Sequence, residues 1–78
     1  MALVVVQTIR GILNDARKLE LLDRITDLMV EIEGRGDPSF RRNVWVRIEE
    51  EDPTHASLGG VKLTEASIAA RFPSEAVG

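Results

Sequence analysis

The chain has 78 residues, a net charge of −3 at pH 7, 44% apolar residues and 29% charged residues, which is the composition of one soluble globular domain. Its length leaves no room for a second core, and its acidic balance disfavours general nucleic-acid binding. With no cysteine and one histidine, it has neither a disulfide framework nor a Cys/His cluster for a structural metal.

A chain this short needs a source of stability beyond its own hydrophobic core. A domain of this size buries only about 60% of the surface of its unfolded chain. Since disulfides and metals are excluded, oligomerisation is the remaining source of stability, and we expect an oligomer. The apolar run from Leu3 to Val6 is too short for a secretory signal or a membrane span. We therefore expect a cytoplasmic protein with no membrane partner and no cofactor.

The first expected element is a strand over residues 2–9. This run, ALVVVQTI, is rich in β-branched side chains and has apolar groups on both faces, as in a strand that is buried on two sides. Arg10 and Gly11 interrupt the pattern. The strand is therefore expected to end at Ile9.

A helix is expected over about residues 14–33. Asn14 is a good N-cap, and Asp15 places an acidic group in the first turn. Gly34 provides a stop signal, and Pro38 cannot continue a helix. The apolar stripe of this amphipathic helix consists of Leu22, Ile25, Leu28, Met29 and Ile32.

A second strand is expected over about residues 43–50, because Val44, Val46 and Ile48 alternate with polar or aromatic residues. Strand, helix and strand at this spacing predict a right-handed βαβ unit with parallel strands. A hairpin and a short helix are expected over about residues 57–71, with Thr64 as the helix cap. Residues 74–78 are expected to fray.

The segment from Val44 to Glu65, VWVRIEEEDPTHASLGGVKLTE, resembles the 4-oxalocrotonate tautomerase family. The resemblance extends over residues 2–65. It implies an α+β fold, with residues 1–78 forming a single tautomerase-like domain that has a short βαβ unit and a C-terminal hairpin. It also implies dimers that assemble into hexamers as trimers of dimers.

The family reaction is a keto–enol tautomerisation, an isomerase activity on a small carboxylated enol or keto acid. Its base is an N-terminal proline whose amine pKa is lowered in an apolar pocket. Here Ala2 stands at that position, and a free amine arises there only if Met1 is removed. The resemblance therefore implies an activity that is weak or lost.

The remaining site assignments are residues expected to bind the substrate through a positive charge or to line its pocket. Arg47 is the second catalytic candidate, because it shares a strand face with Trp45 and presents a guanidinium. The family's arginine after glycine is matched by Ile12 or Leu13, neither of which binds a carboxylate. The positions assigned to substrate binding are Trp45, Arg10, Arg41 and Ala56, the last replacing an aromatic residue of the family.

Simpler interpretations accompany these assignments. Trp45 is expected more often as an interface anchor, and Arg47 as the partner of a glutamate on a neighbouring strand. The glutamates 49–51 are expected at a solvated strand end, and His55 on the surface. Two other functions remain open, namely a non-catalytic partner in a hetero-oligomer and a small protein-interaction module that uses the glutamate run and the loop around Phe40.

Overall fold

A computed structural model describes residues 2–72 of the chain, and the expectations for Met1 and residues 74–78 lie outside this range. The predicted α+β order of strand, helix, strand and hairpin is confirmed. The elements are β1 (Ala2–Ile9), α1 (Asp15–Ile32), the 3-10 helix η1 (Pro38–Asn43), β2 (Val44–Glu51), the 3-10 helix η2 (Pro53–His55), β3 (Ser57–Leu58), β4 (Val61–Lys62) and α2 (Glu65–Arg71).

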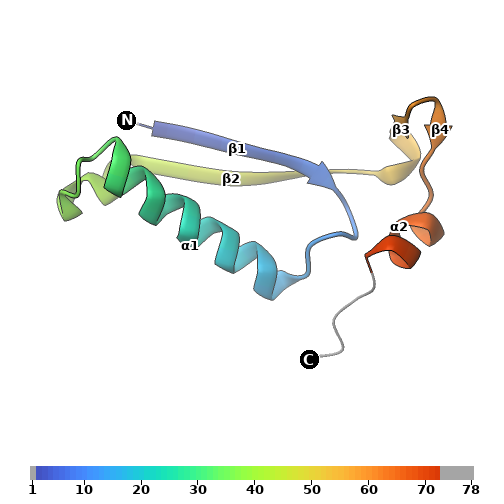
Figure 1. Ribbon diagram of the computed structural model, residues 1–78, viewed down its shortest axis with the longest axis horizontal. Coiled ribbons are helices and arrows are strands. Elements are labelled where there is room, and N and C mark those ends of the chain that lie inside the picture. Colours follow the sequence, from blue (N-terminus) through green and yellow to red (C-terminus); the bar gives the residue numbers. More distant parts are fainter. Residues whose placement is uncertain (1, 73–78) are drawn as a thin grey trace.

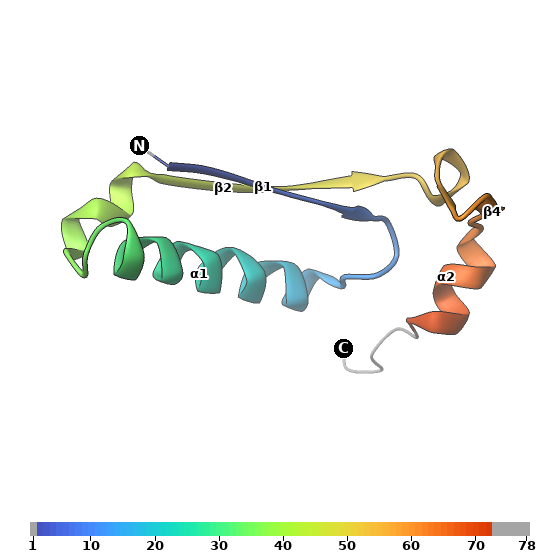
Figure 2. The same cartoon turned by 45° about the horizontal axis from the view of Figure 1, so that its top comes forward.

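The main sheet consists of β1 and β2, which pair in parallel from Ala2 opposite Val44 to Ile9 opposite Glu51. Helix α1 connects them and lies along one face, while the hairpin and α2 extend beyond the carboxyl ends of both strands (Figures 1 and 2). The molecule measures 44 × 31 × 14 Å. Figure 2 shows the sheet nearly edge-on with α1 on one side, and within residues 2–72 no element covers the other face.

Helix α1 begins as expected, with the Asn14 side chain accepting a hydrogen bond of 2.8 Å from the Arg17 backbone N–H. It ends at Ile32 with Glu33 as the C-cap, as predicted. Within residues 34–38, which were expected to stop the helix, Arg35 (53°) and Gly36 (81°) have positive φ. Gly34 is needed for space, since a Cβ there would lie 2.7 Å from both the Phe40 Cβ and the Val30 carbonyl oxygen.

The apolar stripe of α1 is only partly as expected. Leu22, Ile25 and Met29 are half-buried, whereas Leu28 is 50% exposed and Ile32 is 67% exposed. Ile32 lies in the last turn, where α1 reaches past the start of β1 (Figure 1). The predicted spacing of the stripe is therefore present, but Leu28 and Ile32 are exposed in the single chain.

The hairpin closes through Gly59 and Gly60, whose φ angles are 60° and 84°. Positive φ at both central residues is the geometry of a two-residue type I′ turn, which glycine adopts without strain. Thr64 then caps α2 as predicted. Its hydroxyl accepts from the Ser67 N–H at 3.0 Å, and its own N–H donates to the Ser67 hydroxyl at 3.0 Å, which completes a capping box.

The interior is very small. In residues 2–72 the buried side chains are those of Ala2, Pro53 and Ile68, and no residue of α1 is buried. Several large apolar groups are instead open to solvent, including Trp45 (56%), Leu58 (64%) and Val61 (68%). A single chain therefore leaves much of its apolar surface in water.

Candidate functional site

The predicted site residues lie at two separate ends of the β1–β2 sheet. Ala2 begins β1, and Trp45 and Arg41 lie at the same end. Arg10 follows β1, and Ala56 follows β2 and η2 at the opposite end. Because β1 has eight residues and therefore seven intervals, its two ends are about 23 Å apart at roughly 3.3 Å per residue. One chain thus does not bring these residues into one site.

The sheet face opposite α1 carries Trp45 and Arg47. Trp45 is paired with Leu3, and Arg47 with Val5. Exposure alternates along β1, so that Leu3 is 55% exposed and Val5 38%, while the intervening Val4 is half-buried. Trp45 therefore lies in an open apolar strip, as an interface anchor would.

Arg47 is engaged by a carboxylate. Its Nη2 atom lies 2.6 Å from Oε1 of Glu49, and the other carboxylate oxygen of Glu49 accepts from the Gln7 amide at 3.0 Å. The expected partner was a glutamate on a neighbouring strand, and the observed partner is on β2 itself. Residues two apart on one strand share a face, so the ion pair forms locally. The Arg47 side chain is still 52% exposed, and its contact with Glu49 uses only the Nη2 atom, so other N–H donors face solvent.

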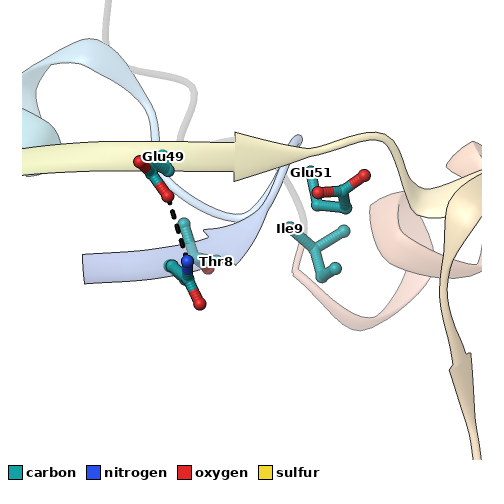
Figure 3. A pocket seen from close by; sticks show the side chains of 5 residues that line it. Thr8, Ile9, Glu49 and Glu51 are labelled. Carbon is teal, nitrogen blue, oxygen red and sulfur yellow. Dashed lines mark hydrogen bonds between the residues drawn. The ribbon is translucent and has the colours of Figure 1, made fainter. Parts of the chain in front are cut away.

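A pocket of about 320 Å³ lies at the carboxyl ends of the parallel strands (Figure 3). Gln7, Thr8 and Ile9 line it from β1, and Glu49 and Glu51 from β2. The pocket presents two carboxylates, of which Glu49 pairs with Arg47 and Glu51 lies 3.6 Å from His55 Nδ1. Such a lining disfavours an anionic ligand, so this pocket does not suit a carboxylated substrate.

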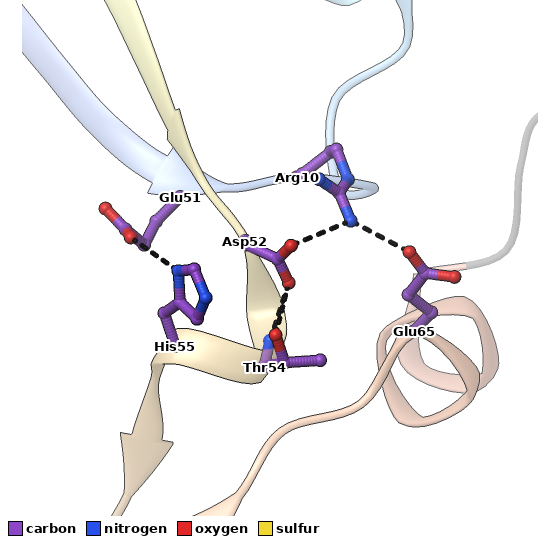
Figure 4. Close-up of polar contacts among 6 residues, drawn as sticks. All are labelled: Arg10, Glu51, Asp52, Thr54, His55 and Glu65. Atoms are coloured by element: carbon purple, nitrogen blue, oxygen red, sulfur yellow. Dashed lines mark hydrogen bonds and ion pairs between the residues drawn. The ribbon is translucent and has the colours of Figure 1, made fainter.

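Arg10 joins three parts of the chain (Figure 4). Its Nη2 atom lies 2.8 Å from Glu65 Oε1 on α2 and 3.5 Å from Asp52 Oδ2 before η2. Its backbone N–H donates to the Glu51 carbonyl at 2.9 Å, which extends the strand ladder. The hydrogen bond to Glu65, followed by the nearby Asp52 charge, raises the pKa of Arg10 above its ordinary value. The positive charge of Arg10 is therefore already paired with two carboxylates of the same chain, those of Asp52 and Glu65.

Asp52 is the fixed member of this group. Its Oδ1 atom accepts from the Thr54 hydroxyl at 2.7 Å and from the Thr54 backbone N–H at 2.9 Å. These two bonds, with Arg10 as a further cation, lower the pKa of Asp52. The acid thus serves as the N-cap of η2 and holds the turn that leads to the hairpin.

The remaining predicted residues have structural partners. Arg41 lies 2.7 Å from Asp27 and attaches η1 to α1. Ala56 contributes its backbone, because its N–H donates to the Pro53 carbonyl at 3.1 Å and its carbonyl accepts from Leu63 at 3.2 Å. Ala2 is 6% exposed at the start of β1.

Sequence reasoning missed three charged partners. The expectation of a solvated strand end is wrong for Glu50, which lies 2.6 Å from Lys18 Nζ and has a side chain only 23% exposed. Asp52 and Glu65 were not selected as partners of Arg10. A signal existed for Asp52, because Asp-Pro-Thr is a capped turn, but nothing local links residue 65 to residue 10.

No protein-family model, curated protein or solved structure matches the chain. The likeness to the tautomerases therefore stays a prediction from the residues. Within residues 2–72 no group of three or more His, Asp or Glu side chains is arranged to hold a metal ion. No helix in that range has both the length and the apolar character needed to cross a membrane.

Proposed function

We propose that this chain is a tautomerase-superfamily subunit whose keto–enol tautomerase activity is weak or lost and whose site is completed by a second chain. The observation that carries the proposal is the separation of the assigned residues. Ala2, Trp45 and Arg47 belong to one part of the sheet, and Arg10 and Ala56 to the other end. A site that needs both ends requires two chains.

Two-fold pairing of sheet edges supplies the missing half. When two such sheets join edge to edge about a two-fold axis, the adjoining strands run antiparallel, so the Ala2 end of one chain lies beside the Arg10 end of the other. The resulting four-stranded sheet removes one open edge from each chain. The exposed Trp45 and Leu3 then provide a surface for packing such dimers, in agreement with a homohexamer built as a trimer of dimers.

The weak chemistry follows from Ala2. Once Met1 is removed, Ala2 carries a primary amine with an ordinary pKa of about 7.7 to 8.0. Burial lowers such a pKa, because desolvation disfavours the ammonium form. The neutral amine first accepts the enol hydroxyl proton of a small enol acid, and a guanidinium stabilises the resulting enolate oxygen. The ammonium formed in this step then gives a proton to the carbon, which regenerates the neutral amine. Without the removal of Met1, the nitrogen of Ala2 is an amide and no base remains.

Intact mass, assembly size and turnover test the proposal together. The intact mass of the purified chain is measured by mass spectrometry, and the molar mass of its assembly by light scattering. Turnover of 2-hydroxymuconate and phenylenolpyruvate is then compared between the wild type and an Ala2→Pro variant. We expect an oligomer, weak or no turnover in the wild type, and a gain in the variant. Wild-type turnover equal to that of the variant would contradict the weakened site, and a monomeric mass would contradict the shared site.

A hetero-oligomer is the second form of this proposal. Here the chain is the non-catalytic partner and lends Arg47 or Trp45 to the proline of another subunit. Its support is that Ala2 lacks the ring amine while Trp45 and Arg47 remain exposed on one face. Restored turnover on mixing with a proline-bearing subunit, when this chain alone is inert, would favour it over the homohexamer.

The interaction-module hypothesis has less support. It assigned partner binding to the glutamate run and to the loop around Phe40. Glu49 and Glu50 each have a cationic neighbour within the chain, Arg47 and Lys18 respectively, and Glu51 lies 3.6 Å from His55 Nδ1. The charges of the run are thus largely engaged already.

A further inference from the structure

Arg10 and Glu65 form the least fixed contact of the group around Arg10. The Glu65 side chain is 75% exposed and reaches the Arg10 guanidinium at 2.8 Å from the first turn of α2. We propose that Glu65 is an internal competitor for Arg10, so that a small carboxylate binds at Arg10 by displacing the Glu65 carboxylate. This inference rests on the proposed function for its ligand class, a small enol or keto acid.

The two acids around Arg10 differ in how easily they leave. Asp52 is 33% exposed and is held by both the hydroxyl and the backbone N–H of Thr54. Displacing Asp52 therefore breaks the cap of η2 as well as the ion pair. Glu65 is mostly in solvent, where an ion pair contributes little and exchanges readily with another carboxylate. The competition is thus with Glu65, while Asp52 keeps Arg10 oriented.

A pocket is present beside this contact. It measures about 160 Å³ and is lined by Arg10, Gly11, Glu65, Ile68 and Ala69. The Ile68 side chain, 5% exposed, and the Gly11 backbone form its apolar wall. Gly11 has a φ of 101°, and a Cβ there would lie 3.2 Å from Ile68 Cγ2, so a larger residue would press on the helix. A small acid thus finds a cation and an apolar surface together.

Displacement of Glu65 does not require α2 to detach. Ile68 anchors the helix by burial, and the capping box of Thr64 and Ser67 fixes its first turn. A change of the Glu65 rotamer alone removes the carboxylate from Arg10. Access of a carboxylate to Arg10 therefore depends on the rotamer of one side chain, Glu65, on a helix that stays in place.

Pyruvate titration followed in ¹H–¹⁵N spectra tests this inference directly. The probes are the amides of Gly11 and Ala69, which line the pocket. Four full-length chains are compared in their native assembly state: wild type, Glu65→Gln, Arg10→Gln and Glu20→Gln. The last is a matched control, since it removes one carboxylate from an exposed pair with Arg24, 3.4 Å away on α1.

We expect Glu65→Gln to bind pyruvate about two- to fivefold more tightly, the range that loss of an exposed ion pair provides. Arg10→Gln should abolish the shifts, and Glu20→Gln should match the wild type. Binding by Glu65→Gln that is no tighter than in the wild type, or shifts that survive in Arg10→Gln, would overturn the inference. These readouts need no turnover. If the protein shows no turnover but Glu65→Gln binds pyruvate more tightly, residual tautomerase activity is contradicted, whereas the competition between Glu65 and the ligand for Arg10 is supported.

Discussion

Gly34 and Phe40 approach so closely that a Cβ on residue 34 would lie 2.7 Å from the Phe40 Cβ. This contact seats η1 against the end of α1, just before β2 begins. We expect Gly34→Ala to destabilise the protein by about 1–3 kcal/mol, as overpacking does. Chemical denaturation of Gly34→Ala, Phe40→Gly and the double variant gives the coupling between the two positions, because only glycine at residue 40 removes the Cβ that an added Cβ at residue 34 would meet. Purely additive effects would contradict the clash.

A second glycine provides the control for that experiment. Gly36 has a φ of 81° and no atom within 4 Å of an added Cβ. Gly36→Ala should therefore destabilise only through its backbone, by about 1–2 kcal/mol. Its effect should not change when Phe40 is also replaced, whereas that of Gly34→Ala should shrink.

Lys18 and Glu50 attach α1 to β2 through a contact of 2.6 Å. The hydrogen bond to Glu50 raises the pKa of Lys18, so the contribution of the lysine to stability is fully present at pH 7 and is lost as the pH rises through this raised pKa. We expect Glu50→Gln to lower the Tm measured by circular dichroism at pH 7. Glu20→Gln, on an exposed pair within α1, should change it less. If both variants lower the Tm equally, the contact between Lys18 and Glu50 contributes no more to stability than an exposed ion pair within α1.

Asp52 predicts a loss of stability in acid. Its pKa lies below the ordinary value of about 3.9, because the Thr54 hydroxyl and backbone N–H donate to the charged form. As the pH falls, the unfolded chain takes up this proton first, so stability declines from about pH 5 downward.

The variant Asp52→Asn isolates this contribution. Its Tm should lie below that of the wild type at pH 7, and the difference should shrink towards pH 3 as the wild-type carboxylate becomes protonated. Asp23→Asn, which removes an exposed carboxylate from α1, is the control and should follow the wild type. If the Tm difference between the wild type and Asp52→Asn is the same at every pH, the charged Asp52 carboxylate is not the source of the stability.

Trp45 tests which face of the sheet is covered on assembly. It is the single tryptophan of the chain and is 56% exposed in the isolated subunit. We expect its fluorescence to shift to shorter wavelength as concentration rises. Trp45→Asp should require at least about tenfold more protein to assemble, because a buried aromatic anchor contributes about 2 kcal/mol or more. Leu19→Asp on α1 should assemble normally, and equal defects would place the interface elsewhere.

The parts of the fold that were predictable have local causes. The β-branched run of residues 2–9, the Asn14 cap and the Thr64 cap each act within a few residues, and the corresponding elements begin where expected. The end of α1 was also predictable, because the glycine and proline signals of residues 34–38 follow it directly. The close approach of Gly34 to Phe40 was not foreseen, because it depends on how η1 packs against α1.

The site was less predictable, because side-chain partners depend on contacts distant in sequence. Arg10 meets a carboxylate 55 positions away. Arg47 was selected correctly as an exposed cation on the Trp45 face, but its partner on the same strand was not foreseen. The separation of Ala2 from Arg10 follows from their places at the start of β1 and directly after its end. The family likeness does not give this separation, because it assigns roles without saying which chain provides each one.

The scarcity of buried side chains has a consequence for how this protein exists in a cell. With only Ala2, Pro53 and Ile68 buried among residues 2–72, the free subunit has little hydrophobic free energy with which to offset its chain entropy. In the proposed oligomer, the second chain that covers the open face contributes to folding through mass action. The folded fraction of this protein should therefore depend on its concentration, and dilution alone, at constant temperature and pH, should unfold it.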